Sequence, residues 1–375
     1  MNAIKVLMVT VTLGKESGVN TFIMNYFRKM DHAKIRIDVL SYLESPDQSE
    51  YAEEITAGGG RIFFAPPVKR FQEHIRFLKR LIRDGRYDIV HDNSLIMTLP
   101  LMMICRRNCI PVRILHSHSS RYGEPGYKEW RNRLFHPFLR ACCTDFLACS
   151  KAAGENIFGN RRYTVLPNVI NGSVFTFSEE TRALIREREK LDGKIVVLTA
   201  GRASAEKNPL FALELMQRVI EKHDNVVYWW VGDGPMKDAM EIRARELGLG
   251  DHLVLWGKQS DMTAFYHAAD IFLLPSLFEG LPYTGVEAQA MGLPCLVSAA
   301  VTEEMVFTDL VRFVSLEAPA GNWCEAMEAL FSRIPLRRSY AAELADSPFS
   351  DTDAGSMLEE LYVRMLEKNR RRRAR

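Results

Sequence analysis

The stretch from Ala269 to Cys295 constrains the fold most, because it joins an apolar run to a helix-forming segment through a turn rich in glycine and proline. The run Ile271–Leu274 has the length and the flanking breakers of a buried strand. After the turn, residues 286–291 are good helix formers, and Gly292 ends them. In an α/β fold such a unit presents backbone N–H groups and the positive end of a helix to an anion.

Two carboxylates bracket this turn. Glu279 precedes it and Glu287 lies about one helical turn inside the helix, so both can face a ligand at the helix mouth. A ligand with a diphosphate and several hydroxyls suits that arrangement. The plain alternative is an ordinary strand-to-helix connection with two solvated glutamates. A two-carboxylate hydrolase is a further alternative, but it is disfavoured because both glutamates sit on one unit and would share a side of the ligand.

The same order of strand, glycine-bearing loop and helix recurs along the chain, which predicts parallel, doubly wound α/β sheets. At 375 residues the chain exceeds one core. We expect domains at residues 1–188 and 189–348, linked by a polar helix at 178–191, then a C-terminal helix and basic tail at 349–375. We expect the helix over 354–368 to pack back on the first domain and the tail over 369–375 to be a disordered, solvated end. The expected strands lie at 4–10, 35–42, 61–64, 87–91, 112–119, 146–151, 163–168, 195–200, 226–231, 253–258, 271–274 and 296–298.

Composition restricts the class of protein. Hydrophobic residues make up 47% and charged residues 26%, as in soluble globular proteins. Seven cysteines without regular spacing predict reduced thiols and a cytoplasmic protein. The first strand is too short and too charged for a targeting peptide. The longest apolar stretch, residues 95–105, contains Pro100 and is too short to span a bilayer, so any membrane contact is expected to be peripheral.

The net charge of +2 hides an asymmetry. Residues 1–188 hold 28 Lys and Arg against 19 Asp and Glu, which leaves 21 against 28 of the chain totals of 49 and 47 for the rest. The halves are therefore charged +9 and −7, and different partners are expected for each. A basic amphipathic helix at 71–83 is expected to pack its apolar stripe on a sheet; the alternative adds contact of its cationic face with anionic lipid.

Three further places carry candidate site residues. Gly18 lies in a polar loop between a strand and a helix and lets the backbone approach a ligand closely. His91, His116 and His118 lie at the ends of two strands, where open α/β sheets bind ligands. Arg202 and Lys207 flank a strand-to-helix turn and can bind phosphates.

Seven segments taken together resemble glycosyltransferase family 4 of GT-B fold over nearly the full length, most closely the bacterial enzymes of exopolysaccharide or capsule assembly. The most specific part is the spacing of the two glutamates in their strand–turn–helix setting, supported by the order of Gly201-Arg202 and Lys207-Asn208. The other segments are Ser17-Gly18-Val19, His116-Ser-His118, Ala148-Cys-Ser150, Pro167-Asn168 and Gly232-Asp-Gly234-Pro.

The resemblance implies two Rossmann-like domains facing across a cleft, and a retaining transfer of a sugar from a nucleotide-sugar donor, UDP-sugar favoured, to a lipid-linked or saccharide acceptor. It implies no cofactor, no metal and no nucleic acid, and a cytoplasmic place of work, possibly at the inner face of the cell membrane with peripheral contact to anionic lipid. A catalytically silent module that binds a nucleotide sugar or a partner enzyme is the alternative function.

By position in the family motif, the resemblance also implies a role for each candidate. The catalytic residues would be Glu279 and His118, with His116 the alternate histidine because the tandem His-x-His leaves the register open. Glu287 would bind the ribose, and Arg202 and Lys207 the diphosphate. The remaining donor-binding residues would be Gly18, Gly257, Lys258, Gly280, Leu281, Tyr283 and Thr284. The loop 299–304 departs from many relatives, so its contact is open.

Overall fold

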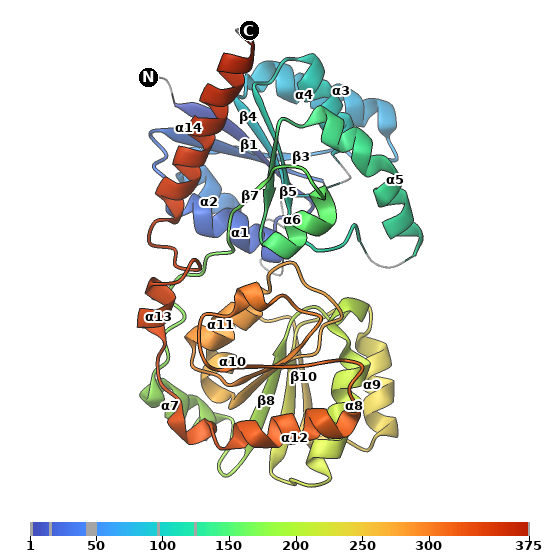
Figure 1. Ribbon diagram of the computed structural model, residues 1–375, viewed down its shortest axis with the longest axis vertical. Helices are drawn as coiled ribbons and strands as arrows, with labels where there is room; N and C mark the ends of the chain where they lie inside the picture. The colour runs from blue at the N-terminus through green and yellow to red at the C-terminus, as the bar shows by residue number, and fades with distance from the viewer. Residues whose placement is uncertain (1–2, 15–16, 43–50, 96–97, 124–125, 374–375) are drawn as a thin grey trace. The chain divides into compact units, whose positions relative to one another are not determined.

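The computed structural model describes residues 3–14, 17–42, 51–95, 98–123 and 126–373. The chain forms two compact units (Figure 1). Unit 1 comprises Met1–Val169 together with Asp351–Arg375, and unit 2 comprises Ile170–Ser350. Each unit is built on one parallel sheet, so the predicted class of two Rossmann-like α/β domains is confirmed.

Unit 1 contains a seven-stranded parallel sheet in the order β3-β2-β1-β4-β5-β6-β7. In Figure 1, α3, α4 and α5 lie on one side of this sheet, and α1, α2 and α14 lie on the other. The strands are β1 (Ile4–Thr10), β2 (Ile35–Ser41), β3 (Ile62–Phe64), β4 (Ile89–Asp92), β5 (Val112–Ser117), β6 (Asp145–Ala148) and β7 (Thr164–Val165). The helices are α1 (Gly18–Phe27), α2 (Ala52–Ala57), α3 (Phe71–Gly85), α4 (Leu99–Arg107), α5 (Tyr127–Cys142), α6 (Lys151–Phe158) and α14 (Ala354–Arg373).

The strand order of unit 1 places its ligand edge. β1 pairs with β2 on one side and with β4 on the other, so the direction of winding reverses there. Val6 to Val9 are fully buried, which is why this apolar run could be predicted as a central strand. Ligands of open α/β sheets bind outside the carboxyl ends of the strands at such a reversal. In unit 1 this edge holds the residues that follow β1, β4 and β5.

Unit 2 contains a six-stranded parallel sheet in the order β10-β9-β8-β11-β12-β13, with its reversal between β8 and β11. Its largest buried side chains include Trp230 and Trp323. The strands are β8 (Ile195–Ala200), β9 (Val226–Val231), β10 (Leu253–Gly257), β11 (Ile271–Leu274), β12 (Cys295–Ser298) and β13 (Val311–Val314). The helices are α7 (Glu179–Arg188), α8 (Pro209–Ile220), α9 (Lys237–Glu246), α10 (Thr263–Ala268), α11 (Tyr283–Ala290), α12 (Ala320–Phe331) and α13 (Ala341–Ala345), with 3₁₀ turns η2 (Ala205–Lys207), η3 (Gly250–His252), η4 (Glu303–Met305) and η5 (Ile334–Leu336).

Helix α14 returns to unit 1 and is longer than the sequence predicts. It packs against α1 and β5, as expected for a C-terminal helix that belongs to the first domain. The prediction of a disordered end from residue 369 is wrong as far as Arg373, because the helix continues to that residue. Asn369 is buried and donates to Asp145 at the start of β6 over 2.9 Å, and Lys368 forms an ion pair with the same carboxylate. These two contacts hold the last turns on the sheet.

Helix α7, expected as the connection between domains, is part of unit 2, which begins at Ile170 rather than at residue 189. The physical reason is that two of its arginines are bonded into that unit. Arg182 and Arg186 both pair with the buried Asp270. Arg182 also donates to the carbonyls that end α10, including that of Ala269 over 2.8 Å.

The amphipathic helix α3 buries its apolar stripe, including Leu78 and Ile82, in unit 1, and exposes Lys79 and Arg80. This is the packing that the sequence favours for it. Among the residues that the structure describes, none of the helices combines the length and the apolar character needed to cross a bilayer.

Candidate functional site

The carboxyl edge of the second sheet is built by glycines that bring three turns together. A Cβ atom on Gly232 would lie 2.0 Å from the carbonyl oxygen of Gly201, and one on Gly234 would lie 2.4 Å from that of Ala203. Gly232 has a φ of +135° and donates its N–H to the carbonyl of Gly257 over 2.8 Å. The Gly-Asp-Gly turn is thus structural, as expected. It supports the turn that carries Arg202.

Lys207 and Glu279 meet at this edge, although they are distant in sequence. The Lys207 Nζ donates to Glu279 Oε1 over 2.6 Å, and Ser276 Oγ donates to the same oxygen over 2.8 Å. The backbone of Leu277 also donates to the carbonyl of Glu206 over 2.8 Å, so the two turns are joined. Because an ammonium group has three N–H donors, this pairing leaves Lys207 able to bind a further acceptor.

Arg202, the second residue after β8, is exposed. In the described part of the chain no ion pair or hydrogen bond engages its side chain. The edge therefore presents a forked cation from Arg202 beside the ammonium of Lys207. Two cations of this kind on adjoining turns suit a diphosphate.

Helix α11 begins at Tyr283, three residues before the predicted start, so Tyr283 and Thr284 form its first turn. Pro282 precedes the helix and provides no side-chain cap, and no acidic residue lies in the first turn. The first amides of a helix have no intrahelical acceptor. Gly280 and Leu281 are buried in the turn just before. The positive end of α11 favours an anion at the same edge.

Glu287 is buried in α11, and its Oε2 accepts a hydrogen bond from the hydroxyl of Tyr266 over 2.7 Å. Burial raises the pKa of Glu287 from 4.5 to about 7, and the bond from Tyr266 acts in the opposite direction. The two carboxylates of the turn therefore have different environments: Glu279 lies against a cation and Glu287 against a phenol. Tyr266, on α10, is a contact that the local sequence pattern does not indicate.

The raised pKa of Glu287 predicts a pH-dependent cost to stability. Between about pH 4.5 and pH 7 the folded chain holds a proton that the unfolded chain has lost, so the free energy of unfolding falls as pH rises through this window. Glu287→Gln, which cannot ionise, should be more stable than the wild type by up to about 3 kcal/mol above pH 7, and by much less near pH 5. Calorimetric unfolding at both pH values measures the difference. Glu303→Gln, at an exposed position of the same unit, is the control, and an equal gain in both variants would contradict the assignment.

The loop after β12, whose contact the sequence left open, is tied to α11 by Gln289. Its amide nitrogen donates to the carbonyls of Gly285 and Met305, and its amide oxygen accepts from the backbone of Phe307 and the hydroxyl of Thr308. The loop contains the short turn η4. It therefore supports α11 from outside the turn that carries Glu279.

In unit 1, three histidines form one cluster at the carboxyl edge of the sheet. The imidazole rings of His116 and His118 lie 4.0 Å apart between centroids, and His91 Nε2 lies 3.1 Å from His116 Nδ1. His91 Nδ1 in turn lies 2.8 Å from the hydroxyl of Tyr362 on α14. Burial lowers the pKa of His91 and of His118 to about 3, and that of His116 well below its usual range. All three rings are neutral at physiological pH.

The two candidate histidines differ in access. His116, the last residue but one of β5, is fully buried and stacks on His91. His118 lies beyond the end of the strand and is only partly covered. Because side chains alternate along an extended segment, His116 and His118 lie on the same side of it. Only His118, which lies beyond the end of the strand, reaches the carboxyl edge of the sheet.

The tautomer of His118 follows from Asn93, which the sequence analysis did not single out. The Asn93 Nδ2 donates to the carbonyls of Val9 and His91, which turns its Oδ1 towards His118. His118 Nε2 lies 2.9 Å from that oxygen, so it carries the proton and leaves Nδ1 as an acceptor. Asn93 directly follows β4. Its position as a polar residue at the end of a strand could have identified it from the sequence as a candidate site residue.

Gly18 is the first residue of α1 and is exposed. Ser17 precedes it without capping the helix through its side chain, and α1 has no acidic residue in its first turn. The buried Asn20 fixes the loop by donating to the carbonyl of Gly14 over 2.9 Å and accepting from Thr10. Lys15 and Glu16 of this loop lie outside the described residues.

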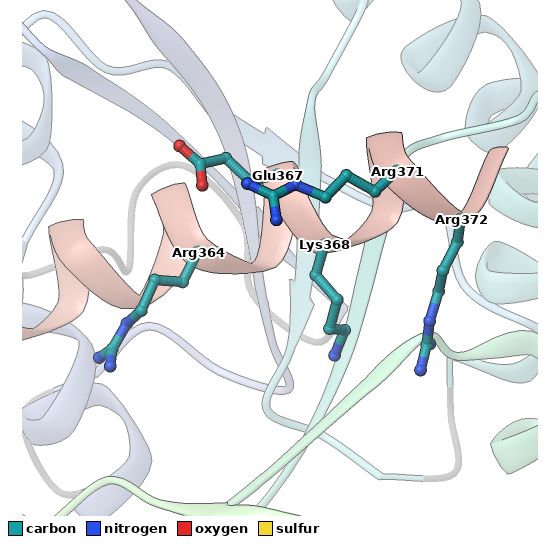
Figure 2. A pocket seen from close by; sticks show the side chains of 5 residues that line it. All are labelled: Arg364, Glu367, Lys368, Arg371 and Arg372. Atoms are coloured by element: carbon teal, nitrogen blue, oxygen red, sulfur yellow. The ribbon is translucent and has the colours of Figure 1, made fainter. Parts of the chain in front are cut away.

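Among the described residues, no three His, Cys, Asp or Glu side chains gather as a metal centre would require. A hollow of about 350 Å³ is lined by α14 side chains (Figure 2), in which Arg364, Lys368 and Arg372 point to one side of the helix. Because Lys368 pairs with Asp145 at the start of β6, this hollow belongs to the amino-terminal edge of the sheet, away from the histidines.

The predicted site residues thus fall into two groups, each at the carboxyl edge of its own sheet. Unit 2 gathers Arg202, Lys207, Glu279 and Glu287, with the 280–284 turn and the Gly257–Lys258 loop. Unit 1 gathers Gly18, His116 and His118. Two doubly wound units, one of which joins paired cations, carboxylates and a helix N-terminus, are what the resemblance to GT-B glycosyltransferases leads us to expect.

Comparison with known proteins identifies the family. Residues 181–341 match the model for glycosyl transferases group 1, and residues 17–174 match the model for Glycosyltransferase Family 4. The putative glycosyltransferase EpsF of Bacillus subtilis is 31% identical over 83% of this chain and 83% of its own length. The chain belongs to the family 4 glycosyltransferases of GT-B fold and is a transferase of polysaccharide biosynthesis.

One further relative and one solved structure are also similar to this chain. The UDP-Gal:alpha-D-GlcNAc-diphosphoundecaprenol alpha-1,3-galactosyltransferase of Escherichia coli is 27% identical over 75% of this chain and 76% of its own length. The structure of Anabaena HepE in complex with UDP-glucose superimposes with a TM-score of 0.80 at 14% identity, covering 96% of this chain and 99% of that one. The latter likeness supports the fold alone.

Proposed function

We propose that this glycosyltransferase moves a sugar from a UDP-sugar to a lipid-linked acceptor, without a metal and with retention of the anomeric configuration. The observation that carries the proposal is the Lys207–Glu279 pair beside Arg202 at the mouth of α11. A relative supports both substrates: the Escherichia coli enzyme is named for UDP-Gal and a diphosphoundecaprenol acceptor. The alternative acceptor for the same reaction is a saccharide that carries no lipid.

The donor would be held by unit 2. As the bond between sugar and diphosphate breaks, negative charge accumulates on the β-phosphate, and preorganised cations stabilise it. Arg202 and Lys207 would bind this diphosphate together with the N–H groups of Tyr283 and Thr284. These groups supply the charge stabilisation for which other enzymes use a bound metal ion. Glu287 would accept from the ribose hydroxyls.

Glu279 would contact the transferred sugar, and His118 would be the catalytic residue that unit 1 contributes. Lys207 and Ser276 donate to one oxygen of Glu279, so the carboxylate is held in position for a hydrogen bond with a sugar hydroxyl. His118, neutral and protonated on Nε2, offers Nδ1 as an acceptor at the carboxyl edge of unit 1. His116 would act as support for His118, because it is enclosed. The first-turn amides at Gly18 would bind phosphate oxygens.

Thermal unfolding with candidate donors tests this function. A UDP-sugar at one hundred times its dissociation constant should stabilise the protein by about 2.7 kcal/mol, in EDTA as well as without it. Arg202→Ala should lose most of the shift, whereas Arg218→Ala, which removes an exposed cation of α8, should keep it. No shift with any UDP-, GDP- or ADP-sugar would contradict the donor assignment, and a shift that disappears in EDTA would contradict metal independence.

Retention has its own measurement. The anomeric configuration of the first-formed product, followed by NMR, should match that of the sugar in the donor. An inverted product would contradict this part of the proposal and leave donor binding unaffected.

A further inference from the structure

Helix α5 exposes an apolar face. Tyr127, Trp130, Leu134 and Phe138 are spaced three, four and four residues apart and therefore lie on one side of the helix. Their exposed fractions are 72%, 62%, 51% and 63%, and Phe135 beside them is 42% exposed. The opposite side of α5 is buried through His136, Leu139 and Cys142.

This arrangement is unusual for a helix that covers a sheet. Such a helix normally turns its large apolar side chains to the core and its charges to water, as α3 does in the same unit. Single exposed apolar residues need no explanation, whereas a contiguous group of large ones marks an interaction surface. On α5 the group extends over about three turns, from Tyr127 to Phe138.

Cations border the apolar face. On α5 itself Arg131 and the exposed Arg133 lie on either side of it. Arg131 is half-buried and also donates to the side-chain oxygen of Asn132 over 2.9 Å. From the neighbouring α4, Arg106 reaches the carbonyl of Ala141 over 3.2 Å. Glu129 is the one carboxylate among the side chains of α5 that the structure describes. A partner with an apolar interior and an anionic surface complements this face.

An anionic lipid surface has both properties. Tryptophan and tyrosine favour the interface between headgroups and acyl chains, and Tyr127 and Trp130 form a ring pair 6.3 Å apart at one end of the face. Leucine and phenylalanine supply the apolar contact, and arginines extend to the phosphates. A second copy of the chain fits less well, because a symmetric contact would bring the arginines of both copies together.

We propose that α5 docks on an anionic membrane through its exposed apolar face, and that this contact brings the lipid-linked acceptor to the carboxyl edge of unit 1. The helix follows β5, and hence His118, through the loop at 119–126. Asn132 holds this loop to α5 by donating to the carbonyl of Tyr122 over 2.6 Å. Glu124 and Pro125 of the loop lie outside the described residues. The use of a lipid acceptor rests on the proposed function, whereas the docking itself does not.

Vesicle flotation of the full-length protein tests the docking. The wild type should bind vesicles of equal parts phosphatidylcholine and phosphatidylglycerol. Leu134→Ser with Phe138→Ser should lower the bound fraction about tenfold. The matched control is Leu184→Ser with Ile242→Ser, which removes two apolar residues of unit 2 that are 63% and 52% exposed, and it should bind like the wild type. Unchanged melting temperatures show that each variant is folded.

Variants that reverse the charge of arginines and lysines test which surface of unit 1 binds the vesicles. Arg131→Glu with Arg133→Glu should weaken binding to the anionic vesicles, and more so at low salt. Two controls carry the same change of charge elsewhere on unit 1: Arg364→Glu with Arg372→Glu on α14, and Lys79→Glu with Arg80→Glu on α3. If either control releases the protein while the α5 variants stay bound, the proposal is overturned.

The remaining outcomes are also decisive. A wild type that ignores both anionic and pure phosphatidylcholine vesicles overturns the proposal. So does a dimer, seen by sedimentation, that the α5 variants dissociate, because the face would then bind a second copy. The thermal shift with a UDP-sugar should be unchanged in the α5 variants. Loss of vesicle binding with that shift intact therefore separates a failure of docking from a failure of the proposed transferase function.

Discussion

Lys207→Ala should lower kcat by about a hundredfold to a thousandfold, the usual effect of removing one preorganised group that stabilises charge in a transition state. In the free enzyme Lys207 Nζ donates to Glu279 Oε1 over 2.6 Å, and its remaining donors suit the β-phosphate as the sugar leaves. The substitution removes both contacts. Because Ser276 still donates to Glu279, the carboxylate keeps one partner, and the fold should remain intact.

Steady-state kinetics with a UDP-sugar, and a melting curve of each variant, measure this effect. Lys222→Ala is the matched control, since Lys222 also pairs with a glutamate, Glu328, but on the surface and away from the site. Lys207→Arg should recover part of the activity, because it restores the charge without the same reach. A variant with a higher KM and an unchanged kcat would show that Lys207 binds donor and transition state equally, which contradicts the assigned role.

His118→Ala should lower kcat by about a hundredfold or more with little loss of stability, whereas His116→Ala should act mainly on stability. His118 is partly accessible at the strand end and holds one nitrogen available, while His116 is enclosed and contacts the rings of His91 and Phe22. Truncating the buried ring leaves a cavity and unpaired neighbours. The melting temperature and kcat of both variants separate the two effects.

Asn93→Ala provides an intermediate test of the same arrangement. It removes the acceptor that keeps the proton on His118 Nε2, so kcat should fall less than in His118→Ala, and its dependence on pH should change. If His116→Ala is folded and inactive while His118→Ala is active, the assignment of the two histidines is reversed.

The sheets were predictable because their strands are buried on both faces. β1, β8, β9 and β11 coincide with the apolar runs chosen from the sequence, since a parallel strand covered by helices tolerates little but apolar residues. β13 was missed, because its side chains are only partly buried and its run of four residues includes Arg312. Once the strands were predicted, the polar motifs at their carboxyl ends could be predicted as site residues.

Other features were not predictable because they join distant parts of the chain. Tyr266 and Glu287 are on different helices, and Tyr362 reaches His91 from the far end of the sequence. No local pattern contains such contacts. Helix α5 was not among the predicted elements for a different reason: a helix with its apolar face outward departs from the usual amphipathic pattern.

The return of α14 to unit 1 has a consequence for the order of events during synthesis. The first sheet leaves the ribosome early, but α14, which contacts His91 through Tyr362 and the start of β6 through Asn369, is made only after the whole of unit 2. Until then part of the apolar face of the first sheet has no cover, which is the state in which chains associate wrongly. Unit 2, built from one continuous segment, has no such delay. The nascent chain is therefore expected to complete its second unit before its first, and to need protection of the first until its last helix arrives.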